Sequence, residues 1–414
     1  MSKGKPFNSY MSNVSFRVIF LLVNSLTWLF IERKNFDMIL NKNSALKQAS
    51  FIVWGVWDLS IISSGIIGAA ALSTKIKRST FLCIWITLGV LASFLNYCLQ
   101  HIQYLQNLLF VILLSSFSGL SFGIGMPSCL SNFAEQTSFE NRGSISGLIF
   151  LISSGITPLI ILISRMEFAS SLISVCWRAT SFIVLTTHKD DVKEISETKK
   201  ISPTFKSILC DKNTMLYFVP WIMFSLVYGF QKVSIEHTLS GDFYELLKVI
   251  QAVSAMISAV IGGVFCDKIG RKRVVMYGFI LLGIAYALVS IAPHWDISFY
   301  FYSLIDGIAW SIFIIIFVLT LWGDLSAIIA KSAEKYYAIG SIPFFFADFV
   351  GFLFATFMQA PISAAFSIAS FFLFLAVVPL MYASETLPEE KRREKELKDY
   401  IERAKRIKEK FTKG

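Results

Sequence analysis

Four ionisable residues lie near the middle of long apolar stretches of the sequence: Asp58, Arg178, Asp306 and Asp348. If those stretches cross a bilayer, an ionised side chain at that depth costs about 2.5–3.5 kcal/mol on insertion scales. Such residues therefore face a water-filled cavity or pair with another polar group. We take these four residues as the centre of any chemistry that the chain performs.

Asp306 and Asp348 lie in the second half of the chain, where no cation at similar depth neutralises them. Burial away from water disfavours the charged form of a carboxyl group, so one of these acids could bind and release a proton as its exposure changes. Gly307 and Ala309 leave room for water beside Asp306. Two alternatives remain open: contact with a cationic ligand or Na⁺, and a permanent hydrogen bond to a neighbouring Ser or Tyr.

Asp58 and Arg178 lie in the first half and have opposite charges at similar expected depth. They either form a structural ion pair or contact a ligand in a central cavity, where the planar guanidinium of Arg178 would bind a carboxylate or phosphate group. The aromatic residues Trp57, Tyr228 and Trp310 lie on stretches that also carry polar groups. They either line the same cavity or anchor and pack the helices.

The composition indicates which elements position these residues. Of the 414 residues, 55% are hydrophobic and 16% are charged, whereas soluble domains have about 25% charged residues. This balance excludes a disordered chain, a nucleic-acid-binding protein and an ordinary soluble enzyme. A bilayer core about 30 Å thick requires about 20 helical residues. The sequence therefore predicts an all-α membrane protein with twelve transmembrane helices, at residues 15–31, 48–72, 80–99, 105–130, 143–164, 168–187, 214–231, 246–266, 274–292, 297–322, 336–358 and 362–383.

The twelve predicted helices divide into two six-helix bundles that are pseudo-repeats of each other. Arg78 matches Arg271 at an offset of 193 residues, and Arg142 matches Lys335 at the same offset. One offset that serves two separate loops favours an internal repeat over chance. We expect an N-terminal bundle at 1–187, a central loop at 188–213, a C-terminal bundle at 214–383 and a charged tail helix at 384–414.

Lysine and arginine indicate the orientation of the helices. Most of the 38 Lys and Arg residues fall on the side that holds both termini and the central loop. Because basic loops stay in the cytoplasm, we expect both termini to be cytoplasmic in a multi-pass protein of the plasma membrane. The six Cys residues have no metal-like spacing, and we expect neither a metal site nor a cofactor.

One loop motif resembles that of a known family. The stretch GVFCDKIGRKR, from Gly263 to Arg273, is similar to the G-x-x-x-D-K/R-x-G-R-K/R-K/R motif of the major facilitator superfamily. Gly263 would let two helices approach closely, and Gly270 would allow a tight turn. Asp267 would accept hydrogen bonds from a helix N-terminus or from a cation on a neighbouring helix, and Arg271 follows the turn. In the first-half copy, Thr74 and Lys77 replace the Asp and the second Gly, so that copy would form a weaker or differently built contact.

Two further motifs resemble the sugar-porter and organic-ion branches of this superfamily. Glu135 precedes Arg142-Gly143 with the spacing of an E-x6-R-G motif, and Ser384-Glu385-Thr386 is similar to P-E-T. The resemblance implies a set of gate contacts at the cytoplasmic face, formed by Glu135, Arg142, Gly263, Asp267, Gly270, Arg271 and Lys335.

The resemblance implies a secondary active transporter that moves a small solute by alternating access. Proton coupling would use Asp306 or Asp348, with Asp58 and Arg178 on the opposite cavity wall. A uniporter and a non-transporting sensor or scaffold of the same fold are the alternatives. We expect a small-molecule substrate, a proton and the lipid bilayer as partners, no nucleic acid and a monomer. The chain has no phosphate loop, no H-E-x-x-H motif and four scattered His residues, so we do not expect an enzyme.

Overall fold

A computed structural model describes residues 15–72, 76–102, 106–163, 169–187, 203–239, 241–329, 333–357 and 361–387. The regular structure in these ranges is helical, which confirms the all-α class. The predicted tail helix, apart from residues 384–387, and most of the predicted central loop lie outside the described residues, as does Thr74.

The helices of the first half lie at the predicted stretches, although the stretch predicted at 105–130 consists of two helices, α6 and α7, with a break at 124–125. They are α2 (Phe16–Leu40), α3 (Ser44–Gln48), α4 (Ser50–Ile67), the π-helical η1 (Gly68–Leu72), α5 (Arg78–His101), α6 (Leu108–Gly123), α7 (Met126–Gln136), α8 (Arg142–Ile163) and α9 (Ala169–Thr187).

The second half of the chain is built from helices as well. They are α10 (Phe205–Cys210), α11 (Lys212–Thr238), α12 (Gly241–Ile269), α13 (Arg271–Ile291), α14 (Asp296–Phe313), the π-helical η3 (Ile314–Thr320), α15 (Leu321–Ile329), α16 (Glu334–Phe357) and α17 (Ile362–Tyr382).

Nine helical stretches among the described residues are long and apolar enough to cross a membrane. Helices also lie at the other three predicted positions, in α2, α9 and α16, although these do not meet the same length and hydropathy criterion. The total of twelve spans therefore stays a prediction. The boundary of the first helix was wrong: α2 continues to Leu40, past the predicted end at residue 31.

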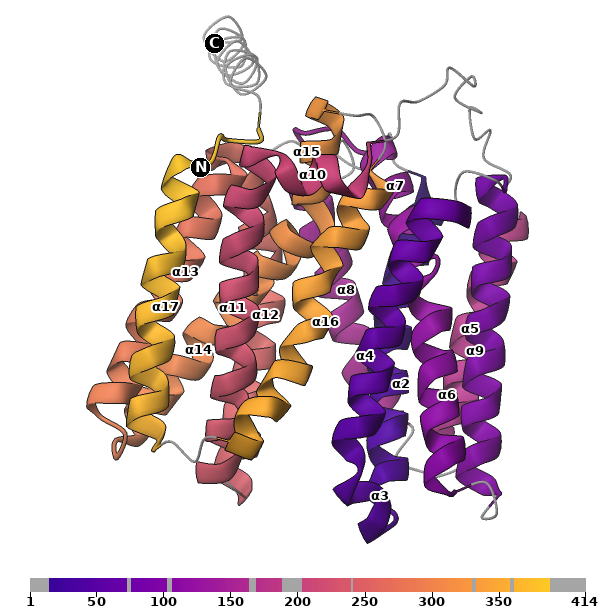
Figure 1. Cartoon of the computed structure of the whole chain (residues 1–414), viewed down its shortest axis with the longest axis horizontal. Coiled ribbons are helices and arrows are strands. Elements are labelled where there is room, and N and C mark those ends of the chain that lie inside the picture. The colour runs from indigo at the N-terminus through magenta and orange to yellow at the C-terminus, as the bar shows by residue number, and fades with distance from the viewer. Residues whose placement is uncertain are drawn as a thin grey trace, which may run out of the picture.

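The helices of the two halves stand side by side (Figure 1). The first half, in indigo and purple, lies beside the second half, in pink to yellow, and the halves meet where α8 packs on α12 and α4 packs on α16. The short helices α7, α10 and α15 gather at the upper end of this view. We call this end of the molecule the α15 end.

Glycine residues bring α8 and α12 into close contact near the α15 end. A Cβ atom on Gly263 would collide with the carbonyl oxygen of Gly143, and one on Gly147 would collide with that of Ala259. Neither position can accept a side chain without separating the two backbones, because the atoms it would meet belong to the main chain. The two halves of the chain are thus joined backbone to backbone at this crossing.

We expect Gly147→Ala to lower stability by about 1–3 kcal/mol, the usual cost of overpacking a tight site. Gly155→Ala on the same helix is the matched control, since its Cβ would meet only the flexible end of Met256, at 3.4 Å. Thermal unfolding of the purified variants measures the difference. Equal melting temperatures for the two variants would contradict a backbone-to-backbone crossing.

Candidate functional site

The carboxylate of Asp267 binds the N-terminus of α8. Its Oδ1 accepts the backbone N–H of Gly143 at 2.9 Å, and its Oδ2 accepts the N–H and the hydroxyl of Ser144 at 2.7 and 2.6 Å. The first N–H groups of a helix lack partners within the helix, and a negative charge there is favourable. Asp267 also lies 3.2 Å from Arg271 Nη2. It therefore makes both kinds of contact that its motif position suggests.

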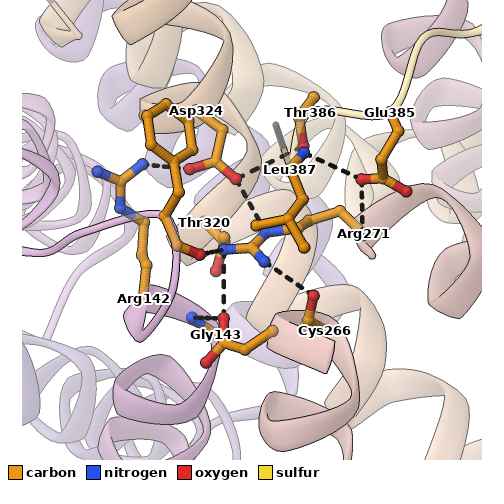
Figure 2. Close-up of polar contacts among 12 residues, drawn as sticks. Arg142, Gly143, Cys266, Arg271, Thr320, Asp324, Glu385, Thr386 and Leu387 are labelled. Atoms are coloured by element: carbon orange, nitrogen blue, oxygen red, sulfur yellow. Dashed lines mark hydrogen bonds and ion pairs between the residues drawn. The ribbon is translucent and has the colours of Figure 1, made fainter. Parts of the chain in front are cut away.

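Asp324 on α15 lies between two arginines from different halves of the chain (Figure 2). Its Oδ1 pairs with Nη1 of Arg142, and its Oδ2 accepts from Nε of Arg271 at 2.9 Å. All three side chains are buried. The remaining donors of Arg142 bind Thr137 Oγ1, at 2.8 Å, and the backbone carbonyls of Ala134 and Thr137 at the end of α7. A buried carboxylate that bridges two arginines holds the first half against the second.

Glu385 binds the N-terminus of α13, the other helix start in this region. Its carboxylate accepts the N–H of Arg271 at 2.9 Å and that of Lys272 at 3.2 Å. Gly270 makes this approach possible, because it has φ +110° and its Cβ position is occupied by the Glu385 carboxylate. We call Arg142, Asp267, Arg271, Asp324 and Glu385 the charge cluster.

A second set of ion pairs lies in the first half around Arg78, the counterpart of Arg271. Arg78 binds Glu135 through two hydrogen bonds of 2.7 and 3.1 Å and lies 3.5 Å from Glu334 on α16. These side chains are partly exposed. Lys335 donates to the carbonyl of Pro203 at 2.9 Å. Arg78 thus connects the first half to α16 through Glu334, whereas Glu135 pairs with Arg78 in its own half and Lys335 binds the segment that precedes α10.

Asp306 is buried in the second half, away from the charge cluster. Gln251 of α12 donates to its Oδ2, while its Oδ1 has no hydrogen-bond partner among the described residues. Gln231 of α11 donates to the hydroxyl of Tyr302, four residues before Asp306, at 2.6 Å. A carboxyl group with one donor retains the capacity to bind a proton or a cation. Asp348 lies on α16, but its side chain is outside the described part of the structure.

The predicted aromatic residues occupy two separate places. Trp310 packs edge-on against Tyr228, with ring centroids 4.6 Å apart, and its Nε1 has no hydrogen-bond partner among the described residues. Trp57 is buried against Phe36, with centroids 4.9 Å apart. Trp310 and Tyr228 therefore lie on the Asp306 helix and the adjacent α11, whereas Trp57 packs within the first half.

Arg178 does not pair with Asp58, although both are buried. Its guanidinium lies over the rings of Trp28 and Trp85, 5.0 and 4.4 Å from their centroids. Its Nη1 donates to Ser25 Oγ at 2.8 Å and to Asn24 Oδ1 at 3.2 Å. Two indole faces and neutral oxygens thus stabilise this cation.

Glu32 on α2 is a fully buried carboxylate that the sequence analysis missed. Asn96 donates to its Oε2 at 2.7 Å, and Ser93 and Ser174 donate to its Oε1. Trp28 connects this site to Arg178, since its ring contacts the guanidinium and its Nε1 donates to Ser93 Oγ at 2.6 Å. Glu32 follows the predicted end of the first helix and is followed by Arg33 and Lys34. The sequence therefore indicated a loop at this position.

Comparison with known proteins identifies the fold. No family model matches the sequence, and no curated protein matches it. Solved structures do match. The major facilitator superfamily transporter FucP in its outward conformation has 12% identity and a TM-score of 0.64, covering 88% of this chain and 98% of its own. A bacterial homologue of the iron transporter ferroportin, in an outward-facing state, has 15% identity and a TM-score of 0.66, covering 90% and 97%.

The proton:xylose symporter XylE bound to 6-bromo-6-deoxy-D-glucose has 15% identity and a TM-score of 0.63, covering 92% of this chain and 97% of its own. The chain has the major facilitator superfamily fold. In this fold the motif from Gly263 to Arg271 comprises the end of α12, the turn at Gly270 and the first residue of α13, and it supplies two members of the charge cluster. The sequence did not predict a role for Asp324, because this residue lies two residues past the predicted end of its helix. The signal that could have found it is its isolation, since it is the only charged residue between Gly307 and Ala330.

Asp324→Asn should destabilise this major facilitator fold by about 3–5 kcal/mol, because it leaves two buried arginines without their shared charge. Glu245→Gln removes an exposed ion pair with Lys248 and should cost less than about 1 kcal/mol. Thermal or denaturant unfolding of the two variants in the same detergent compares them. A loss for Asp324→Asn as small as that for the control would show that the cluster does not hold the halves together.

Proposed function

We propose that the chain is a secondary active transporter that moves a small solute by alternating access. Two six-helix bundles, residues 1–187 and 214–383, would rock about a central cavity, as in transporters built from repeated halves. The observation that carries the proposal is the charge cluster. It joins α8 of the first half to α12, α13 and α15 of the second half through contacts that a rocking motion would break together.

The state described here has the α15 end closed by the charge cluster. Two of the similar structures are described as outward conformations, which supports assigning the α15 end to the cytoplasmic face. The positive-inside rule supports the same assignment, because the basic α12–α13 turn lies at this end. We infer that both termini are cytoplasmic and that the protein resides in the plasma membrane.

Asp306 is the proposed proton-coupling residue. It is buried, it has one hydrogen-bond donor among the described residues, and it lies on α14 one turn before Trp310. A buried carboxyl group of this kind is favoured in its protonated form when the site is closed and in its ionised form when water enters. Alternating access would therefore change its proton occupancy once in each cycle.

Asp267→Asn should slow transport turnover more than it weakens substrate binding. Hydrogen bonds to a charged group contribute about 1.5–3 kcal/mol each, so loss of the charge should shift the balance between the two states by about tenfold or more. The control is Asp242→Asn, an exposed residue at the opposite end of α12. Uptake into proteoliposomes, with binding measured separately, tests this. Normal turnover in Asp267→Asn would refute the gate.

Asp306→Asn should abolish the response of solute accumulation to a pH gradient while leaving solute exchange at equal concentrations on the two sides. Exchange needs the reorientation of loaded carrier only, whereas accumulation needs the proton to bind and leave. Asp296→Asn, an exposed residue at the start of the same helix, should leave both activities intact. A wild-type protein that ignores the pH gradient would instead be a uniporter, and a protein with neither activity across a broad solute library would be a sensor or scaffold.

A further inference from the structure

An apolar groove lies on the outer surface of the second half, between α12, α13 and α14. It encloses about 350 Å³. Its walls include Ile261, Phe265, Tyr277, Leu281, Ile308 and Ile312. The first four of these side chains are about 40–50% exposed, so the groove opens outward from the bundle rather than into it. A hydrophobic groove on this surface of a membrane protein faces the acyl chains of lipid.

The length of the groove corresponds to one leaflet of the bilayer. Along α12 its lining runs from Ser258 to Ile269, the last residue of the helix. At about 1.5 Å per residue this is roughly 16 Å, about half of a hydrocarbon core of about 30 Å. The groove therefore starts at the α15 end, beside the α12–α13 turn, and ends near the middle of the membrane.

Two exposed basic residues continue the walls of the groove beyond its apolar part. Lys268 follows Ile261 and Phe265 at positions i+7 and i+3, so the three share one face of α12. Arg273 precedes Tyr277 by four residues and shares a face of α13 with it. Both basic side chains are exposed. Neither takes part in a hydrogen bond or ion pair with the residues that the structure describes, in contrast to the adjacent, fully engaged Arg271.

We propose that this groove binds one acyl chain of an anionic glycerophospholipid, with the lipid phosphate against Lys268 and Arg273. An apolar channel of one-leaflet length with cations at its headgroup end matches both parts of such a lipid. A zwitterionic lipid fills the groove equally well, but its own cation repels the two basic residues. The site therefore distinguishes lipids by headgroup charge.

The same turn carries the lipid site and part of the charge cluster. Asp267 directly precedes Lys268, and Arg271 lies two residues before Arg273, but Asp267 and Arg271 are buried in the bundle. A lipid that braces α12 against α13 in this arrangement stabilises the state in which it binds. Anionic lipid should therefore favour the closed α15 end.

Native mass spectrometry of the purified full chain can test the lipid site directly. The probes are phosphatidylglycerol and phosphatidylcholine with identical acyl chains, titrated separately. We expect phosphatidylglycerol to bind more tightly, and each of Lys268→Gln and Arg273→Gln to weaken it by about fivefold, the effect of about one basic residue at a lipid surface. Lys212→Gln, an exposed residue at the start of α11, should not weaken it.

Filling the groove provides a second and independent variant. Ile261→Trp should reduce binding of both lipids, whereas Ile257→Trp, which is exposed one turn away on α12 and does not line the groove, should not. Equal affinity for the two lipids, or unchanged phosphatidylglycerol binding in Lys268→Gln and Arg273→Gln, would overturn the proposal. So would a change of oligomeric state in Ile261→Trp with lipid binding intact, which would assign the groove to a second copy of the chain.

Discussion

The buried carboxylate of Asp324 is the interaction on which the closed α15 end depends. It faces Arg142 from the first half and Arg271 from the second half, and the side chains of all three are removed from water. Buried charges of this kind contribute little net stability as a group but are strongly destabilising when one member is lost. Such a cluster is stable when fully assembled and unstable when partly assembled, so its contacts should form and break together.

The backbone supports this cluster at three points. Asp267 binds the start of α8, Glu385 binds the start of α13, and Gly270 supplies the positive φ that lets Glu385 approach. Each acid satisfies N–H groups that a helix cannot satisfy itself. The first half contains the counterpart arginine, Arg78, but holds it with partly exposed partners. Arg78 and Arg271 are 193 residues apart, the offset on which the predicted repeat rests, but among the described residues only the second-half turn carries the buried form of this arrangement.

The sequence predicted the all-α class and named three of the five residues of the charge cluster as gate contacts, Arg142, Asp267 and Arg271, because both predictions follow from local patterns. Apolar length locates helices, and the Gly-x-x-x-Asp spacing locates the turn at Gly270. The partners of these residues depend on distant segments. Nothing local to Asp324 indicates that two arginines meet it, and nothing local to Arg178 indicates that Trp28 and Trp85, rather than Asp58, stabilise its charge. Glu32 was missed because the first helix was predicted to end at residue 31. Hydropathy places a helix end poorly where charged residues extend the helix.

The buried charges differ in how far their surroundings compensate them, and this difference separates structural residues from candidates for transport. Glu32 accepts from three side chains. Arg178 has two indole faces and two oxygen acceptors on Nη1, while its Nε and Nη2 have no hydrogen-bond partner among the described residues. Asp306 has Gln251 as its donor and one oxygen without a partner among the described residues. Glu32, with donors to both of its carboxylate oxygens, has little reason to change during a cycle. The poorly compensated carboxyl of Asp306 gains most from a proton or from water, and either gain depends on the state of the surrounding helices.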